Sequence, residues 1–275
     1  MAADGDFVSY TGFTVERASG VLTLTLDRPE VGNALASEAI PQLAQVFRSA
    51  ATDPAVRVVL IRANGPAFCA GGDVKGFART IDQSPAERRE DYRARMDRAR
   101  EQVEAFLALP CPVVVACQGA VAGAAVAYPL GADIALAEPG TRLVFPHQRL
   151  ALPPDGGLSY LLPRAVGVRK AAELVLTAAT VDADEALRLG LISRIVPTEE
   201  LQQEAASVAA RLSRAPLGAV RRARELLKGS LERTLGEQLI AERDAVAESV
   251  AEADFEEGVR AFMEKRRAVF PSTNG

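Results

Sequence analysis

Apolar positions along the first half of the chain follow two different periods. Residues 21–29 (VLTLTLDRP) alternate apolar side chains with threonine before a turn signal, which predicts a strand with one buried face. Residues 56–63 (VRVVLIRA) and 111–119 (CPVVVACQG) are almost continuously apolar, a pattern typical of strands buried on both faces. Residues 37–51 and 85–109 have helical spacing, and the second of these is so rich in Arg and Glu that we expect an exposed helix.

The second half of the chain is mainly helical. Residues 133–137 (DIALA) and 141–145 (TRLVF) predict short strands, and beyond them nearly every segment has the helical period, with one strand-like piece at 191–197 (LISRIVP). Strands that alternate with helices, followed by a helical tail, predict an α/β fold with a C-terminal helical subdomain. We expect the core to span residues 1–205 and the helical subdomain residues 206–275.

Composition and charge narrow the class of protein. The chain has 275 residues, of which 48% are hydrophobic and 25% charged, as in a soluble protein with a sizeable core. A net charge of -4 gives no broad basic surface, so we expect no nucleic-acid partner. Three scattered cysteines favour a reducing compartment, and no His/Cys cluster suggests a metal site. Because no secretory signal or uninterrupted apolar span is present, we expect a cytoplasmic protein that does not cross a membrane.

Two segments share the order of buried strand, small-residue loop and helix start. They are VRVVLIRANGPAFCAGGDVKGF and CPVVVACQGAVAGAAVAYPLGAD. Small residues let a ligand approach the backbone, and the first amides of a helix have no internal partner. Two such amides aimed at one point would hold a developing oxyanion. The alternative is a pair of tight turns with no ligand, and neither segment has the spacing of a phosphate-binding loop.

Several motifs, in one order along the chain, resemble the enoyl-CoA hydratase/isomerase (crotonase) family. They are LDRPEVGNAL, AFCAGGDVKGF, CQGAVAGAAVAYPLGADIALA, PPDGGLSYLLPRAVG, ADEALRLGLISRIVP and FEEGVRAFMEKR. The pattern is most similar to the isomerase branch with a PD-GG motif, such as the 1,2-epoxyphenylacetyl-CoA isomerases. The resemblance implies a crotonase-type spiral of ββα units with a C-terminal helical trimerisation region, and a homotrimer or a dimer of trimers.

The resemblance also implies the ligand and its contacts. The ligand is an acyl-CoA thioester, so coenzyme A is part of the substrate and no cofactor is bound by the protein itself. The two backbone amides that hold the thioester enolate map to Gly72 and Ala124. The positions expected to contact coenzyme A, the last two often in a neighbouring subunit, are Arg28, Ala70, Asp73, Lys75, Phe262 and Lys265. Ordinary surface charge is the alternative for Arg28 and Lys75, and bracing of the loop is the alternative for Asp73.

One carboxylate is the leading candidate for moving a proton. Hydratases of this family are similar in using two glutamates, and those positions fall on Ala127 and His147 here, so we expect an isomerase rather than an ordinary hydratase. Asp155 in PPDGG matches the acidic residue of the isomerase branch, and one carboxylate is sufficient for a 1,3-proton shift. An apolar pocket that favours such a base is expected from Leu150, Leu152, Pro153, Leu158 and Leu161. The alternative for Asp155 is a helix cap.

His147 is the only histidine of the chain. As a neutral imidazole it can accept a proton near pH 7, act together with Asp155, or orient a polar acyl group. Ser159 completes an inventory of Ser, His and Asp, but no GxSxG elbow is present and we do not expect a hydrolase triad. Cys69, beside the first glycine loop, is expected to pack rather than to act as a nucleophile.

Three functions remain as alternatives. The leading hypothesis is an acyl-CoA isomerase in which Asp155 shuttles a proton while Gly72 and Ala124 hold the enolate. A second keeps the enolate and uses His147 for decarboxylation, hydrolysis or hydration of an unusual acyl-CoA. A third is a non-catalytic acyl-CoA-binding subunit.

Overall fold

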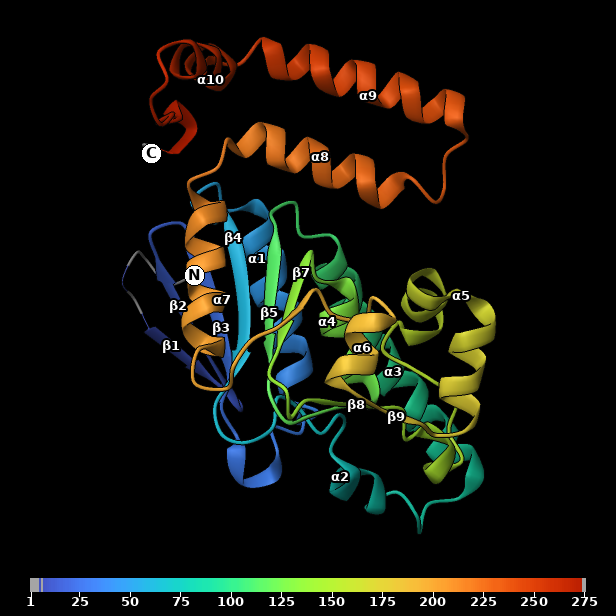
Figure 1. The fold of residues 1–275 in the computed structure, drawn as a ribbon. Coiled ribbons are helices and arrows are strands. Elements are labelled where there is room, and N and C mark those ends of the chain that lie inside the picture. Colours follow the sequence, from blue (N-terminus) through green and yellow to red (C-terminus); the bar gives the residue numbers. More distant parts are fainter. Residues whose placement is uncertain (1–4, 6, 274–275) are drawn as a thin grey trace.

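A seven-stranded sheet, in the order β1-β2-β3-β4-β5-β7-β10, forms the centre of the molecule (Figure 1). The computed structural model describes residue 5 and residues 7–273, apart from the side chains of Val74 and Lys75. The first three strands pair antiparallel and the others pair parallel, so the predicted α/β fold is confirmed. The strands are β1 (Phe7–Tyr10), β2 (Phe13–Ala18), β3 (Val21–Leu26), β4 (Val58–Ala63), β5 (Val113–Cys117), β7 (Ile134–Ala137) and β10 (Arg194–Ile195).

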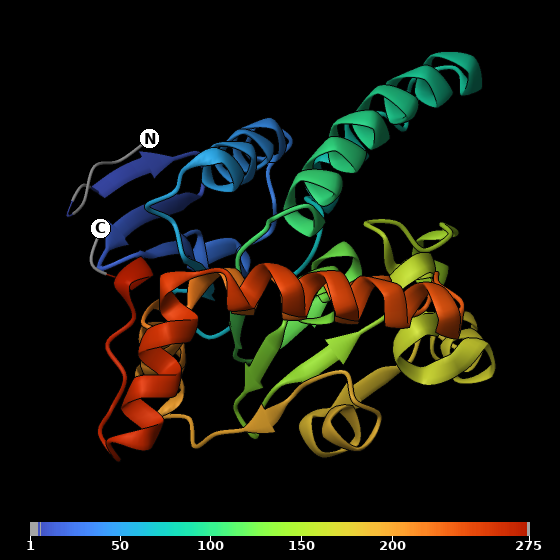
Figure 2. The ribbon, with the colours of Figure 1, turned by 90° about the horizontal axis from the view of Figure 1, so that it is seen from above.

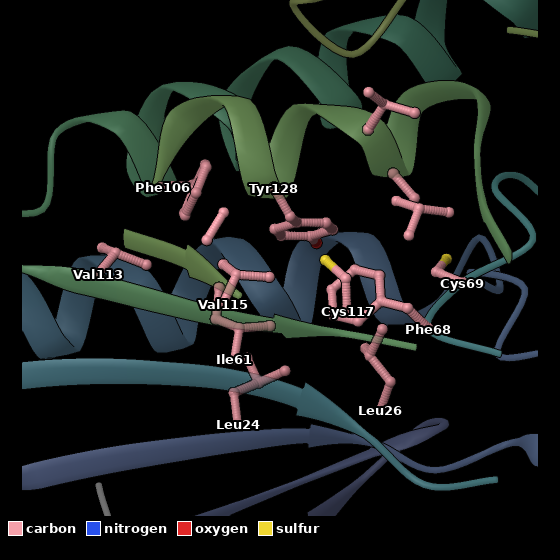
Figure 3. Packing of buried hydrophobic residues seen from close by; sticks show 14 of the residues in the cluster. Leu24, Leu26, Ile61, Phe68, Cys69, Phe106, Val113, Val115, Cys117 and Tyr128 are labelled. Carbon is pink, nitrogen blue, oxygen red and sulfur yellow. The ribbon is translucent and has the colours of Figure 1, made fainter. Parts of the chain in front are cut away.

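The central strands are apolar on both faces because each face packs against helices. In β4, Val59 and Ile61 belong to a large core that includes residues of α1 (Ala39–Thr52), whereas Val58 and Leu60 belong to a smaller core under α7 (Leu201–Ser213). Successive side chains of a strand point to opposite faces, so a continuous apolar run is required here. Figure 1 shows α7 and α1 on opposite sides of the sheet, and Figure 3 shows part of the larger core.

A second sheet of three strands lies beside the first. It consists of β6 (Ala120–Ala122), β8 (Arg142–Val144) and β9 (Thr180–Asp182). The chain passes from β5 to β6 through Gly119, whose φ is +52° and where a Cβ would lie 2.0 Å from the carbonyl oxygen of Pro66. Only glycine permits so close a turn. The sequence predicts a small-residue loop between β5 and the next helix, but β6 occupies that place, because this segment pairs with β8.

Short helical segments connect these sheets. Beyond β6, the expected helix is divided into a 3-10 turn, η2 (Gly123–Val126), and α4 (Ala127–Gly131). The remaining segments before the C-terminal region are η1 (Pro29–Val31), α2 (Val74–Ala78), α3 (Pro85–Leu107), η3 (His147–Leu150), α5 (Leu158–Leu176) and α6 (Ala183–Arg188). Within the described part of the chain, no helix is both long and apolar enough to cross a membrane.

Helix α3 projects from the body of the molecule (Figure 2). A capping box between Ser84 and Glu87 starts it, with Pro85 in its first turn. Its only buried residues are Gln102, Ala105 and Phe106, near the C-terminal end. The prediction of an exposed helix is therefore confirmed for its N-terminal part, while the C-terminal end packs against α1.

Three C-terminal helices form a layer that stands apart from the sheet (Figures 1 and 2). They are α8 (Leu217–Gly229), α9 (Leu235–Val250) and α10 (Ala253–Met263), and η4 (Pro271–Thr273) follows. The expected boundary after residue 205 falls inside α7, which packs on the sheet through Val208 and Ala209, and the helices that leave the sheet begin with α8.

Arg224 ties this layer to the core. The buried guanidinium of this α8 residue donates from Nε to both carboxylate oxygens of Asp133, at 2.9 and 2.7 Å, and also bonds the Leu109 carbonyl. The Asp133 carboxylate in turn accepts from the Val113 amide at the start of β5 (2.8 Å). A buried charge is stable only when it is paired in this way.

Candidate active site

The loop after β4 and the turn after β5 lie side by side. The Cys69 amide donates to the Ala120 carbonyl (3.0 Å), and the Cys69 carbonyl accepts from the Ala122 amide (2.9 Å). A Cβ on Gly71 would lie 2.8 Å from the Ala122 carbonyl oxygen, so the approach of the two backbones depends on glycine at this position. The two glycine-rich turns of the sequence therefore meet at one place.

Two backbone amides at this meeting point are unpaired among the described residues. Gly72 follows Gly71 in the first loop, and Ala124 follows Gly123 in η2, where the φ of Gly123 is +58°. Neither amide donates a hydrogen bond to another described residue, and both residues line the same cavity. Unpaired amides of this kind can donate to an anionic oxygen.

The cavity has a volume of about 150 Å³ and is bounded by residues from both glycine turns, α3 and η3. Small residues form the part next to the two amides, and apolar side chains form much of the rest. The lining residues are Leu35, Ser37, Ile40, Ala70, Gly71, Gly72, Asp73, Phe77, Arg95, Met96, Arg98, Ala99, Gly123, Ala124, Pro146, His147, Leu150, Leu152 and Asp155. Of the leucines and proline expected around Asp155, Leu150 and Leu152 are therefore present, while Leu158 is buried in the core.

His147 and Asp155 form a pair that faces this cavity. The distance from His147 Nε2 to Asp155 Oδ1 is 3.2 Å. His147 belongs to η3, and Ala151, with a φ of +53°, ends that turn and directs the chain toward Asp155. The His147 side chain is 7% exposed, whereas that of Asp155 is 39% exposed. Asp155 is thus the member of the pair that a ligand in the cavity can reach.

The partner of Nε2 indicates how the imidazole is protonated. When Asp155 is ionised its carboxylate can only accept hydrogen bonds, and in that state the proton shared by the pair lies on Nε2. The other nitrogen, Nδ1, is buried and has no partner among the described residues. In this tautomer Nε2–H donates to the Asp155 carboxylate and holds it in position. The basic nitrogen is then Nδ1, which does not contact Asp155.

The geometry does not support the helix-cap role for Asp155 or a triad with Ser159. Helix α5 has Gly157 at its N-cap position, and no side-chain hydrogen bond caps it, so Asp155 is not its cap. Ser159 is exposed and is not part of the cavity lining, so it does not complete a triad with the pair. The Asp155 side chain lines the cavity, where it can contact a bound ligand.

The cysteines and metal chemistry contribute little to the site. Burial raises the pKa of the Cys69 thiol to about 12, so this residue is a packed thiol, as its sequence context predicts. The thiol lies 3.1 Å from the Asn33 carbonyl oxygen. Across residue 5 and residues 7–273, no group of three or more His, Cys, Asp or Glu side chains is arranged to hold a metal ion.

The positions expected to contact coenzyme A are only partly assembled within one chain. Ala70 and Asp73 line the cavity. The Arg28 guanidinium instead bonds the Ala34 carbonyl (3.1 Å) and packs over Gly12, where a Cβ would lie 2.3 Å from its Cδ. The side chain of Lys75 lies outside the described residues. Phe262 and Lys265, at the end of α10, are exposed and do not reach this cavity of their own chain.

Three residues at or next to the cavity do not stand out in the sequence. Asn33 is buried, and its Nδ2 donates to the carbonyls of Asn64 (2.9 Å) and Ala67 (2.8 Å), so it fixes the start of the first glycine loop. Arg95 and Arg98 of α3 line the cavity. Their i, i+3 spacing was visible in the sequence, but many other arginines on the same helix obscured it.

Comparisons with known proteins all lead to the same family. A sequence model of the family described as enoyl-CoA hydratase/isomerase matches residues 16–273. The chain is similar to a trans-2-decenoyl-(acyl-carrier-protein) isomerase of Streptococcus mutans, at 33% identity over 92% of this chain and 95% of the relative. It is also similar to a 1,2-epoxyphenylacetyl-CoA isomerase of Escherichia coli K12, at 34% identity over 91% of this chain and 95% of the relative.

A solved structure resembles the whole chain. It is an enoyl-CoA hydratase of Mycobacterium smegmatis, which superposes with a TM-score of 0.86 at 30% sequence identity. The match covers 95% of this chain and 99% of that one. The relatives thus include proteins named as isomerases and a protein named as a hydratase.

Proposed function

The chain belongs to the enoyl-CoA hydratase/isomerase family, and we propose that it is an acyl-CoA isomerase. The resemblance and the crotonase-type α/β fold expected from the motifs are confirmed by the family match and the solved relative. One observation carries the choice of isomerase. Asp155 faces the same cavity as the unpaired amides of Gly72 and Ala124, whereas Ala127 and His147 stand at the positions expected for a hydratase glutamate pair.

The proposed reaction moves one proton along a 3-enoyl-CoA. The thioester carbonyl oxygen accepts hydrogen bonds from the Gly72 and Ala124 amides, each worth about 10²–10³-fold in rate. The Asp155 carboxylate removes a proton from the carbon next to the thioester, and the electron pair delocalises into the carbonyl as a dienolate. The Asp155 carboxyl, whose side chain is 39% exposed and whose proton exchanges with solvent, then protonates the γ carbon, and the double bond moves from position 3 to position 2. No atom is gained or lost, and coenzyme A enters and leaves as part of the substrate.

His147 acts in this proposal through Asp155. Its Nε2–H bond to Oδ1 fixes one carboxylate oxygen, which leaves the other oxygen for the substrate. The remaining carboxylate of the cavity lining, Asp73, has a local role, because its Oδ1 accepts a bond of 3.4 Å from the Gly76 amide of α2. Asp155 is therefore the better candidate for the base.

Ala127 supports the choice of isomerase over hydratase. It is 5% exposed within α4 and does not line the cavity. Addition of water by a glutamate pair needs two carboxylates that share one water molecule, and a methyl group at this position has no proton to give. A reaction that conserves all atoms of the substrate needs only one acid/base.

The test is the fate of a 3-enoyl-CoA incubated with the wild-type protein in D2O and, separately, in H2¹⁸O. We expect 2-enoyl-CoA that carries deuterium and no ¹⁸O. A 3-hydroxyacyl-CoA that contains ¹⁸O as the first product would overturn the isomerase assignment in favour of hydration. Release of free coenzyme A would indicate hydrolysis, and binding of the thioester without any exchange would indicate a non-catalytic subunit.

We also propose that the C-terminal layer joins copies of this chain into a homotrimer or a dimer of trimers. Large apolar side chains of α8 to α10 are exposed in the single chain, with exposed fractions of 75% for Leu227, 76% for Leu235 and 82% for Phe262. So many apolar side chains on one layer are typical of a surface that is covered in an assembly. A neighbouring copy would bring Phe262 and Lys265 to the coenzyme A portion of the substrate.

Light scattering on the purified protein tests this assembly. We expect a mass that is three or six times the 29.1 kDa of one chain. Leu235→Asp should lower that mass by placing a charge in the interface, and Leu187→Asp, an exposed leucine on α6, is the matched control that should leave it unchanged. A monomer in the wild type would contradict the proposal.

A further inference from the structure

Two arginines of α3 line the cavity and could bind a negatively charged group of a ligand. Arg95 and Arg98 are the only cationic side chains among the described lining residues, apart from the His147 ring if it is protonated. Two other arginines of α3 are paired, since Arg93 lies 3.5 Å from Glu90 and Arg100 lies 3.0 Å from Glu104, whereas Arg88 and Arg89 form no ion pair within the described chain but do not line the cavity. Within the described chain, Arg95 and Arg98 form no ion pair.

The position of these arginines relative to Asp155 follows from the contacts of α3. Val103 Cγ1 lies 3.2 Å from where a Cβ on Gly157 would be, so this level of the helix is next to the Asp155 loop. Arg98 is five residues and Arg95 eight residues before Val103, and a rise of 1.5 Å per residue places them about 7.5 and 12 Å away along the helix axis. They therefore lie beyond the reaction centre, on the part of the cavity formed by α3.

The surroundings of the two arginines differ. The Arg95 guanidinium carbon lies 5.3 Å from the centroid of the Tyr92 ring, and a Cβ on Gly76 would be 4.0 Å from both Arg95 Nη1 and Asp73 Cγ. Arg95 is therefore positioned by an aromatic ring and is close to one carboxylate. Arg98 has no such neighbour among the described residues. Its charge is the one that a ligand could pair.

Apolar side chains also line this cavity. They are Met96 and Ala99 of α3, Leu150 of η3, and Leu152 just after it. A hydrocarbon chain fits such a lining, and a guanidinium at its end forms a strong bidentate pair with a carboxylate. The cavity thus combines a thioester site, an apolar stretch and a cationic end.

We propose that Arg98, assisted by Arg95, determines specificity by binding a carboxylate on the acyl chain, so that the substrates are monothioesters of dicarboxylic acids. This inference rests on the proposed function, since it places the thioester at Gly72 and Ala124. The carboxylate replaces the water around the Arg98 guanidinium and fixes the far end of the chain. An acyl group with a methyl terminus leaves that guanidinium without a partner.

Binding of unreactive saturated thioesters tests the inference independently of turnover. Calorimetry compares adipoyl-CoA with hexanoyl-CoA, which has the same number of carbons but no carboxylate, and extends to the four- and eight-carbon pairs to cover other lengths. Hydrogen bonds to charged groups are worth enough for about a 10- to 100-fold difference in Kd, so we expect the dicarboxylic member of at least one pair to bind that much more tightly. Equal or weaker binding of the dicarboxylic member in every pair would overturn the inference.

Variants assign the effect to residues. Arg98→Gln should remove most of the preference by weakening only the dicarboxylic thioester, and Arg95→Gln should weaken it less. Arg93→Gln is the control, because Arg93 is on the same helix but does not line the cavity. If Arg98→Gln weakened both thioesters equally, and the loss disappeared with pantetheine thioesters that lack the phosphates of coenzyme A, the arginine would bind phosphate and the inference would be wrong.

The outcome is separable from that of the proposed reaction. A preference for dicarboxylic thioesters without proton exchange would leave the inference standing and contradict only the isomerase assignment. Isomerisation of a monocarboxylic 3-enoyl-CoA, with no carboxylate preference in the binding series, would leave the reaction standing and contradict only the inference.

Discussion

Asp155→Asn should lower kcat for double-bond migration by about 10²–10⁴-fold, the usual contribution of a positioned acid/base. Asparagine has nearly the same shape and can still bond His147, but its amide cannot take up and return a proton. Binding of saturated thioesters should change little. The measurement is the rate of deuterium incorporation and double-bond migration, followed by mass spectrometry. Asp184→Asn, an exposed aspartate in the first turn of α6, is the control and should keep wild-type rates.

Substitutions of His147 show whether this residue positions Asp155 or is itself the acid/base. We expect His147→Ala to lower kcat by about tenfold, less than Asp155→Asn, because the carboxylate remains but loses one hydrogen bond. His147→Gln, whose amide can donate to the carboxylate as Nε2–H does, should recover part of that loss. If exchange persisted in Asp155→Asn and vanished in both histidine variants, the acid/base would be His147 and the proposed mechanism would be wrong.

Gly156→Ala should reduce kcat/KM by about 10²-fold through the oxyanion site. A Cβ at Gly156 would lie 2.6 Å from Ala124 Cβ and 2.9 Å from its Cα, so the backbone that carries the Ala124 amide must move. Gly190→Ala is a matched control. Gly190 also has a positive φ, +75° against +61° for Gly156, but a Cβ there meets nothing within 4 Å.

The two alanine variants share the cost of a left-handed backbone, about 1–2 kcal/mol, and differ only in the contact with Ala124. Thermal unfolding should therefore shift downward in both, while activity falls in Gly156→Ala alone. An equal loss of activity in the two variants would mean that backbone strain, rather than the position of the amide, caused it. Full activity in Gly156→Ala would show that the Ala124 amide is not needed.

The pairing of His147 with Asp155 matters for how the chain relates to its family. A glutamate replaced by a histidine reads, in the sequence, as a lost catalytic group. In the structure the His147 side chain is buried, and its Nε2 forms a hydrogen bond with the carboxylate of Asp155, eight residues later. In the proposed mechanism, the residue at the position expected for a second acid/base therefore orients Asp155 instead, which suits a reaction that moves one proton and adds no water.

Local patterns were sufficient for most of the fold. Continuous apolar runs marked β4 and β5, because a strand covered on both faces is apolar at nearly every position, with Arg62 near the end of β4 the exception. The two glycine turns were also visible, since backbone that must approach other backbone leaves no room for a Cβ. Strand β6 was not visible. Its three residues have no period of their own, and only pairing with β8 makes them a strand.

The sequence by itself determined the family, and through that resemblance it predicted the two amides and the absence of a glutamate pair, because each depends on residue identity at a local position. Tertiary structure alone decided which side chains share the cavity. It brought Asp155 Oδ1 to 3.2 Å from His147 Nε2 through a left-handed residue at Ala151, and it placed Arg95 and Arg98 in the cavity lining on a helix whose sequence favours no single face. Such contacts join separate segments of the chain, and no local period records which face of an exposed helix will meet another segment.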